Sequence, residues 1–144
     1  MLIRQATQAD IDMLTILANK MVGNTLFTNI SKERIAKILS VPTAVVFVAE
    51  EKEIVGFICG ALHEQFFTQQ KFANDMALFV EPKHRGGSAA FKLVKAFENW
   101  AKEKGASHVW LGQSVGQNID DTTKFYTRLG YTLAGVNTVK EVKG

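Results

Sequence analysis

Cysteine and proline are scarce in this chain, with one cysteine, Cys59, and two prolines among 144 residues. A single cysteine forms no internal disulfide, so the cysteine content gives no argument for export. The longest apolar run, residues 54–62, is about half as long as a membrane-spanning helix. The first ten residues also lack the long apolar stretch of a secretory signal. We therefore expect a cytoplasmic protein with no membrane partner.

An excess of either charge is also missing. The chain has 17 Lys and Arg residues against 14 Asp and Glu residues, a formal net charge of +3. This mild excess permits an anionic ligand but lacks the dense basic face of a nucleic-acid-binding protein, so we expect no nucleic-acid partner. The length and the ordinary apolar content predict one globular domain, which we assign to residues 1–144.

Metal and nucleotide motifs are absent as well. Neither GxxxxGK[ST] nor GxGxxG occurs, which argues against a P-loop nucleotide triphosphatase and a Rossmann dehydrogenase. The three histidines, His63, His84 and His108, show no metal-ligand spacing with Cys59 or with one another. We therefore expect no metal site, and we expect Cys59, which lies among apolar neighbours, to be a buried and unreactive thiol.

Hydrophobic periodicity predicts the elements of the first half of the chain. Residues 2–6 resemble a short strand, and residues 7–23 and 31–40 resemble helices, the second capped by Ser31 and stopped by Pro42. Residues 43–50 and 53–64 are rich in β-branched and apolar residues and predict an antiparallel hairpin.

The second half alternates strands and helices. We predict strands at 73–80 and 107–113 that run parallel, because the helix over residues 86–104 connects them. A short helix over residues 120–130 and one or two strands within residues 131–142 follow. The whole order predicts a mixed sheet with helices on its faces, an α+β fold of three layers.

The segment "PKHRGGSAAFKLVKAFENWAKEKG", residues 82–105, places a basic residue and two adjacent glycines at the start of a helix. An apolar face of this helix predicts that it lies on the sheet: Ala90, Leu93, Val94, Phe97, Trp100 and Ala101. The free N–H groups and the dipole of its first turn suit a phosphate or pyrophosphate, with Arg85 as a further donor. A glycine-containing junction without any ligand is the alternative that this local pattern leaves open.

Two motifs together make the chain resemble the GNAT superfamily of N-acetyltransferases. The first is "VEPKHRGGSAAFKL", residues 80–93, which resembles the acetyl-CoA motif [Q/R]-x-x-G-x-[G/A] with Arg85 first and Ala90 last. Ser88 stands where the family usually has glycine, which puts the strength of CoA binding in question. The second is "KFYTRLGYTLAG", residues 124–135, preceded by Asn118. The resemblance implies a GNAT-like fold in which strands 73–80 and 107–113 splay apart.

This resemblance also implies how acetyl-CoA, the cosubstrate, would bind. Backbone groups of Leu78, Phe79 and Val80 would pair with the pantetheine, and an N–H near Phe79 or Val80 would stabilise the oxyanion. We predict that the pyrophosphate is surrounded by Arg85, Gly86, Gly87, Ser88, Ala89 and Ala90. Asn118, which precedes the helix of the second motif, is the last predicted cofactor-binding residue. An Asx turn or a helix cap is the alternative role of Asn118.

Tyr126 corresponds to the family's general acid, which protonates the departing thiolate. On periodicity alone it would be a core aromatic residue. Asp75 is our first candidate for the general base, His63 and Glu64 are the second, and a chain of water molecules is a further alternative. For each of the three side chains a solvated strand end is the alternative interpretation.

The sequence does not specify the acceptor, which we expect to be a primary amine of a small molecule, peptide or protein. Segments 21–30, 63–72 and 134–142 would line its site. The aromatic residues Phe27, Phe66, Phe67 and Phe72 fit an acceptor pocket, a homodimer contact or an exposed patch equally well. Two alternatives to an N-acetyltransferase remain: a non-catalytic acyl-CoA-binding module, and a toxin-like enzyme acting on aminoacyl-tRNA.

Overall fold

The computed structural model describes residues 1–23, 30–112 and 119–142. Five strands form one sheet in chain order: β1 (Leu2–Gln5), β2 (Ala44–Glu50), β3 (Ile54–Glu64), β4 (Lys71–Val80) and β5 (His108–Trp110). The first four strands pair antiparallel, and β4 and β5 pair parallel. The predicted hairpin, the predicted parallel pair and the mixed sheet are confirmed.

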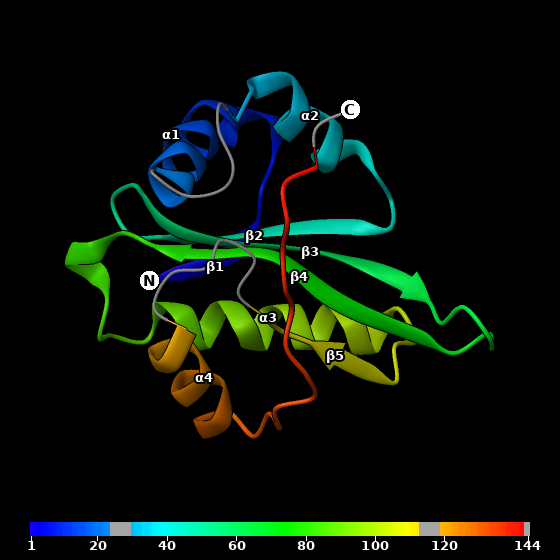
Figure 1. Ribbon diagram of the computed structural model, residues 1–144. Coiled ribbons are helices and arrows are strands. Elements are labelled where there is room, and N and C mark those ends of the chain that lie inside the picture. Colours follow the sequence, from blue (N-terminus) through cyan, green and yellow to red (C-terminus); the bar gives the residue numbers. More distant parts are fainter. Residues whose placement is uncertain (24–29, 113–118, 143–144) are drawn as a thin grey trace.

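Helices cover both faces of the sheet (Figure 1). On one face lie α1 (Ile11–Val22) and α2 (Lys32–Ser40), and on the other lie α3 (Ala89–Glu103) and α4 (Ile119–Arg128). Short 3-10 helices, η1 (Gln8–Asp10) and η2 (Pro82–His84), precede α1 and α3. The result is the three-layer α+β fold predicted from the sequence. No helix of the described ranges is long and apolar enough to cross a membrane.

Local sequence signals set the ends of the N-terminal helices. The Ser31 side chain accepts a hydrogen bond from the Arg34 N–H at 3.3 Å, which caps α2 as predicted. Thr7 and Asp10 form a capping box around η1, in which the Thr7 N–H donates to the Asp10 carboxylate at 2.8 Å. The first turn of the predicted helix is therefore a 3-10 turn, and α1 proper begins at Ile11.

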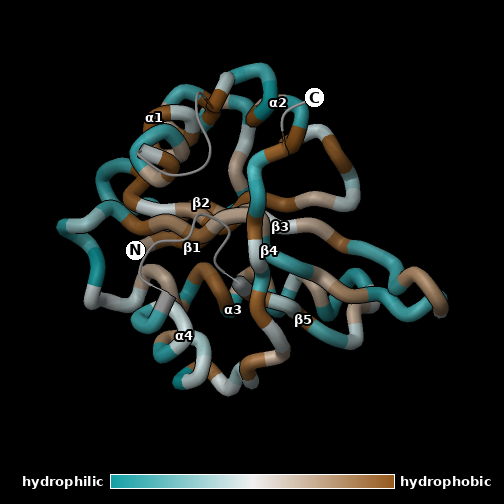
Figure 2. Tube along the Cα trace, in the orientation of Figure 1, coloured by the Kyte–Doolittle hydropathy of each residue, from teal (hydrophilic) through white to brown (hydrophobic). Residues whose placement is uncertain are grey.

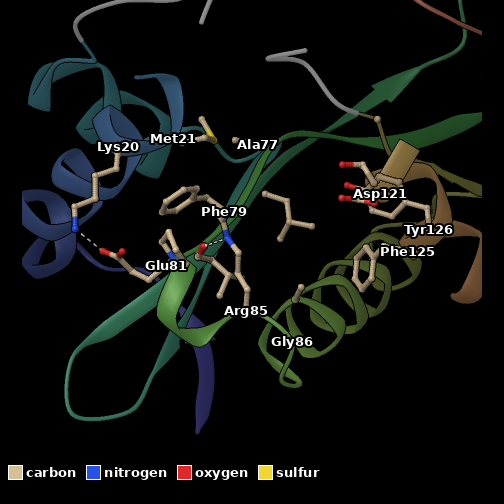
Figure 3. A pocket seen from close by; sticks show the side chains of 16 residues that line it. Lys20, Met21, Ala77, Phe79, Glu81, Arg85, Gly86, Asp121, Phe125 and Tyr126 are labelled. Carbon is tan, nitrogen blue, oxygen red and sulfur yellow. Dashed lines mark hydrogen bonds and ion pairs between the residues drawn. The ribbon is translucent and has the colours of Figure 1, made fainter. Parts of the chain in front are cut away.

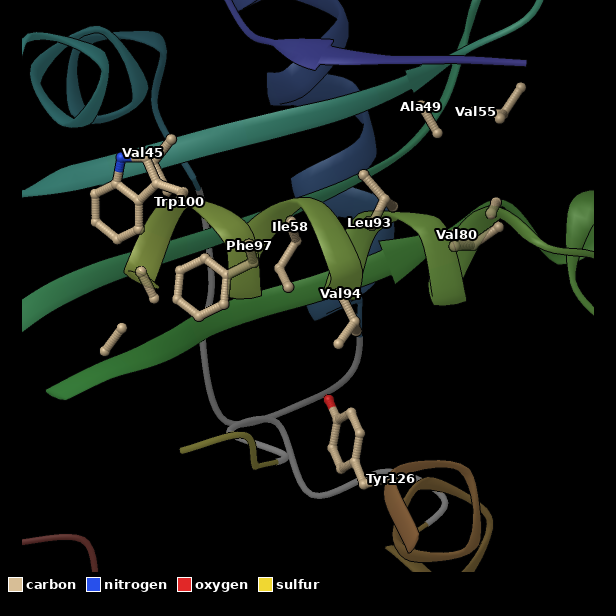
Figure 4. Packing of buried hydrophobic residues seen from close by; sticks show 13 residues of the cluster. Val45, Ala49, Val55, Ile58, Val80, Leu93, Val94, Phe97, Trp100 and Tyr126 are labelled. Carbon is tan, nitrogen blue, oxygen red and sulfur yellow. The ribbon is translucent and has the colours of Figure 1, made fainter. Parts of the chain in front are cut away.

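Two hydrophobic clusters hold the layers together. Between the sheet and α3, the predicted apolar face of the helix is confirmed, because Leu93, Val94, Phe97 and Ala101 are fully buried (Figure 4). Cys59 is buried in the cluster beneath α1 and α2, as predicted. The hydrophobic stretches accordingly concentrate in the central strands and the inner faces of the helices (Figure 2).

A bulge and a close contact shape the centre of β4. Cys59 pairs with Ala77 but Gly60 pairs with Asp75, so β4 carries one residue more than β3 at this point. Gly60 also lies directly under the Phe97 ring, since a Cβ on it would lie 2.3 Å from that ring. Glycine is therefore required at position 60 for α3 to reach the sheet.

Several predicted boundaries are wrong. Residues 131–142 are all described and form no strand, because a β-rich sequence forms a strand only where a neighbouring strand pairs with it, and most side chains of this segment are exposed. Of the strand predicted at 107–113, the described residues 107–112 form a strand only over His108–Trp110, and residue 113 lies outside the described ranges; β4 begins earlier than expected, at Lys71. Helix α3 begins at Ala89 rather than residue 86, because the turn before it includes Gly86 in a left-handed conformation.

Candidate active site

A cleft of about 860 Å³ opens where β4 and β5 separate. These strands pair only from Phe72↔His108 to Asn74↔Trp110 within the described ranges. Further along β4, the edge that would face a longer β5 borders the cleft instead, and α4 forms the opposite wall (Figure 3). The splayed parallel strands implied by the family resemblance are thus present.

The turn between β4 and α3 forms one end of this cleft. Gly86 has a φ of +85°, and no atom of the described residues lies within 4 Å of a Cβ placed on it. The backbone conformation therefore requires glycine, and the space beside it is open to a ligand. Ser88 is the N-cap of α3 and makes no side-chain capping hydrogen bond. The first N–H groups of α3 are consequently available to an anion.

Arg85 is anchored at this end of the cleft. Its Nε donates to the Val80 carbonyl oxygen at 2.7 Å, and its guanidinium carbon lies 5.3 Å from the centre of the Phe79 ring. These contacts fix the orientation of the guanidinium and use one of its five N–H donors. The other four donors can bind a phosphate. The hydrogen bond from Arg85 occupies the Val80 carbonyl, which is one of the backbone groups predicted to bind pantetheine.

The structure brings most of the predicted cofactor residues together. Lining the cleft are Leu78, Phe79, Val80, Arg85, Gly86 and Ala90. Gly87 and Ser88 are exposed on the same turn, whereas the Ala89 side chain is buried in the core, so only its backbone faces the turn. Asn118 lies outside the described residues.

An ion pair that the sequence does not predict lies on the side of the cleft formed by α1 and the end of β4. Lys20 of α1 contacts the Glu81 carboxylate at 2.6 Å, and both residues line the cleft. Glu81 follows β4 directly and would place a negative charge near a bound phosphate. Lys20 offsets that charge, and the pair also ties α1 to the end of β4.

Asp75 lies at the bulge, at the point where β4 leaves β5. Its carboxylate accepts a hydrogen bond from the Gly112 N–H at 3.1 Å, which bridges the separating strands. Burial raises the pKa of Asp75 to about 6, although the hydrogen bond from Gly112 acts in the opposite direction. Asp75 is half-buried in the middle of β4, so a solvated strand end does not describe its position. A carboxyl group with such a pKa is largely ionised at neutral pH and can accept a proton.

Tyr126 lies in the α4 wall of the cleft. It is 8% exposed and belongs to the core cluster, and its hydroxyl points from α4 toward the sheet (Figure 4). Its ring lies 5.4 Å from that of Phe125 and 6.0 Å from that of Tyr131. Burial, and secondarily the negative charge of Asp75, raise the pKa of the Tyr126 hydroxyl well above its usual range. Tyr126 is thus both a core residue and a protonated donor at the cleft.

A second cavity, of about 520 Å³, adjoins the first, and we call it the side pocket. Its lining residues come from the β3–β4 hairpin, from β5 and from the C-terminal segment: His63, Glu64, Phe72, Asn74, Asp75, Trp110, Leu111, Gly112 and Asn137. Gly112 lines both cavities. The second candidate bases, His63 and Glu64, are exposed at this pocket and lie apart from the cleft lining.

Sequence reasoning missed Trp110, Leu111 and the Lys20–Glu81 pair. Trp110 is 54% exposed, although the sequence predicts only an ordinary strand residue there. The sole available signal is a tryptophan near the end of a predicted strand. The aromatic residues predicted for the acceptor site lie in different places. Phe72 lines the side pocket, whereas Phe66 and Phe67 form an exposed T-shaped pair at the hairpin tip. Phe27 lies outside the described residues.

Acetyl-CoA fits this arrangement on structural grounds. The cleft extends from the α3 turn to Gly112, the hydrogen-bond partner of Asp75, and its volume is in the range of small-molecule sites. Among the described residues no strand pairs with the β4 edge from Ala77 to Phe79 that borders the cleft, so this edge can take an extended amide chain, and a glycine turn, a helix N-terminus and Arg85 can take a pyrophosphate. Among the described residues no group of three His, Cys, Asp or Glu side chains could hold a metal ion.

Known proteins share both the sequence pattern and the fold. Over 128 residues, the chain is 29% identical to Probable N-acetyltransferase HLS1 of Arabidopsis thaliana, a match of 74% of this chain and 32% of that protein. The chain therefore spans about a third of the length of this curated relative. Among solved structures, a tetramutant of the BH1408 protein from Bacillus halodurans superposes with a TM-score of 0.84 at 18% identity, over 99% of this chain and all of that one.

An aminoglycoside acetyltransferase, meta-AAC0020 from an uncultured soil metagenomic sample, was solved in complex with sisomicin. It superposes with a TM-score of 0.75 at 22% identity, over 99% of this chain and 95% of its own. The model of the Acetyltransferase (GNAT) family matches residues 21–131, which include every residue of the cleft lining except Lys20, the α3 turn and Tyr126. The chain accordingly belongs to the GNAT acetyltransferase family.

Proposed function

We propose that this protein transfers the acetyl group of acetyl-CoA to a primary amine. The observation that carries the proposal is the placement of Asp75 and Tyr126 about a cleft between diverging parallel strands, Asp75 at their point of separation and Tyr126 in the α4 wall. Membership of the GNAT family supports the reaction type, and the sisomicin complex shows that a protein of related fold accepts an amine-bearing molecule.

The chain's own residues would hold the cofactor along β4 and at the α3 turn. The β4 edge from Ala77 to Phe79 offers backbone hydrogen-bonding groups to the pantetheine, as a further strand would. Arg85 and the N–H groups that follow Gly86 bind the pyrophosphate, where charge-assisted bonds are strongest. The Lys20–Glu81 pair keeps the cleft end from repelling that anion.

Acetyl-CoA supplies an activated acyl group, since its C–S bond breaks as the new C–N bond forms, which yields an N-acetyl amine and free CoA. A primary amine attacks only when neutral, and its pKa in water is near roughly 10, so a base must first remove a proton. Asp75 accepts that proton, directly or through water, because its carboxylate lies at the junction of the cleft and the side pocket.

Tyr126 supplies the second proton of the reaction. Its hydroxyl is held protonated by burial at all ordinary pH values, so it is ready to donate to the departing sulfur. The two protonic groups therefore have complementary roles, one accepting from the amine and the other donating to the thiol. Cys59 takes no part, because burial raises the pKa of its thiol to about 12.

The proposal is tested by incubating the protein with acetyl-CoA and a panel of primary amines. We expect free CoA thiol and N-acetyl product in equal amounts, measured by thiol titration and mass spectrometry. Cys59 is buried and contributes little to the thiol signal. If CoA appears without acetylated amine, or neither appears above the protein-free rate, the proposed transfer is wrong.

A further inference from the structure

The side pocket lies on the face of the sheet opposite α3. Ala73 of β4 is fully buried in the α3 cluster, and Val109 of β5 packs against that cluster. Because side chains alternate along a strand, their neighbours Phe72, Asn74 and Trp110 point to the other face. These neighbours form the floor of the side pocket, and the C-terminal segment borders it at Asn137.

The floor of the side pocket is aromatic. Phe72 and the His63 ring lie 5.3 Å apart, and Trp110 pairs in register with Asn74, two positions further along β4 from Phe72. Trp110 is 54% exposed, which is a large apolar surface for a strand residue beside a cavity. Flat apolar groups and cations are both attracted to such ring faces.

The charge of the side pocket is negative. Glu64 and Asp75 line it, and no Lys or Arg is among its described lining residues. By the alternation of side chains Glu64, two positions after Leu62, points to the α3 face, so the carboxylate at the pocket is that of Asp75, which accepts a hydrogen bond from Gly112. One carboxylate at a small aromatic cavity suits a ligand with a single cationic group. A polyanion would be repelled, and a molecule with many amines would leave most of them unpaired.

An unpaired acceptor lies in the same wall. The Asn74 amide nitrogen donates to the Asp75 carbonyl oxygen at 3.1 Å, whereas its Oδ1 is buried without a hydrogen-bond partner among the described residues. A buried acceptor without a donor is costly, and a ligand N–H can offset that cost. The aromatic floor, the Asp75 carboxylate and this oxygen thus all favour a ligand that carries a cationic N–H donor on an apolar body.

From these observations we infer that the side pocket binds the acceptor, and that the acceptor is a primary arylalkylamine, in which one ammonium group is carried on a flat aromatic body. The aromatic body lies on Trp110 and Phe72, and the ammonium lies toward Asp75. The inference rests on the proposed function, since the side pocket meets the cofactor cleft at Gly112. It goes further by specifying the class of amine.

Equilibrium binding without cofactor tests the side pocket separately from catalysis. The probe is 2-phenylethylamine, titrated by calorimetry beside butylamine, which lacks the ring, and 2-phenylethanol, which lacks the charge. We expect 2-phenylethylamine to bind at least about tenfold more tightly than either. Equal binding of the three compounds, or none by 2-phenylethylamine, would overturn the inference.

Variants locate the binding site. Trp110→Ala should weaken 2-phenylethylamine binding at least about tenfold, and Trp110→Phe, which keeps an aromatic face, should weaken it no more than about threefold. Phe66→Ala is the matched control, because Phe66 is 89% exposed and lies outside both cavities; it should change nothing. If Phe66→Ala weakens binding as much as Trp110→Ala, the side pocket is not the site.

Acetylation assays then separate the two proposals. Preferred binding of 2-phenylethylamine without its acetylation would retain the side pocket as a site for this amine class but contradict the transfer reaction. Acetylation of butylamine and 2-phenylethylamine with equal kcat/KM would retain the transfer reaction but contradict the amine class.

Discussion

Burial has opposite consequences for the two proposed proton-transfer residues. At Asp75 it brings the pKa to about 6, within reach of neutral pH, whereas at Tyr126 it moves the pKa away from neutrality. A base accepts a proton most efficiently when its pKa lies near the working pH, and burial moves Asp75 toward that value. At Tyr126 burial keeps the hydroxyl protonated but makes it a weaker acid, so its proposed role depends on its position in the cleft wall and not on its pKa.

Tyr126→Phe should lower kcat about 100-fold, at the lower end of the range for general acids, while the Kd of acetyl-CoA changes by less than about twofold. The ring and its packing remain, so only the hydroxyl is lost. Tyr131→Phe is the matched control, because Tyr131 donates to Glu98 at 2.5 Å and does not line the cleft. It should keep full activity. An unchanged kcat in Tyr126→Phe would eliminate Tyr126 as the acid.

The pH profile should report Asp75. Its folded pKa is above the ordinary value, so kcat/KM should rise with pH as the carboxyl ionises around pH 6. In Asp75→Asn that step should disappear and the rate should fall, although Asn can still accept the hydrogen bond from Gly112. A variant that retains both the step and the rate would show that another base operates.

The same shift has a thermodynamic consequence with a definite sign. Between the ordinary Asp pKa and about 6, the folded state binds more protons at Asp75 than the unfolded state does. The stability of the wild type relative to Asp75→Asn should therefore fall as pH rises from about 4 to about 7. Urea unfolding at several pH values measures this difference, and a difference that is constant with pH would contradict the burial of Asp75.

At the scale of elements, the approach of α3 to the sheet depends on Gly60. In Gly60→Ala, the new methyl would collide with the fully buried Phe97 ring, and we expect a loss of about 1–3 kcal/mol in the free energy of unfolding. Gly135→Ala is the matched control, because in the part of the chain that the structure describes nothing lies within 4 Å of its Cβ position. Urea denaturation compares them, and equal stability of the two variants would contradict this packing.

The elements that the sequence predicts best are those whose pattern is local. The apolar face of α3, the Ser31 cap and the hairpin of β2 and β3 each follow from neighbouring residues, and all three are confirmed. The wrong prediction of strands in residues 131–142 has the opposite origin. Their β-rich composition expresses a preference, but pairing depends on a partner strand distant in the chain, and in the described residues none pairs with this segment.

At the scale of the whole molecule, the candidate site could be predicted only in part for the same reason. The α3 turn is contiguous in sequence, so its residues could be recognised together. The two adjoining cavities draw Tyr126, Asp75 and Trp110 from three separate elements, and the side pocket adds Asn137 from a fourth segment. Neither the burial of Asp75 nor the exposure of Trp110 has a local signature.

The account depends most on the assignment of the cleft to acetyl-CoA. Ser88, which replaces the usual glycine of the motif, is exposed at the N-cap position of α3 and makes no side-chain capping hydrogen bond, and the turn beside it is open at Gly86. The position of Ser88 is therefore compatible with CoA binding. This conclusion is independent of the acceptor and can be tested without one.

Calorimetric titration with acetyl-CoA, CoA and ATP in parallel tests this claim most directly, on protein first shown by denaturation and mass spectrometry to carry no copurified CoA. We expect acetyl-CoA and CoA to bind with a Kd in the micromolar range, equivalent to about 8 kcal/mol, and ATP to bind at least about 100-fold more weakly. Binding of ATP as tight as that of acetyl-CoA, or of none of the three ligands, would contradict it.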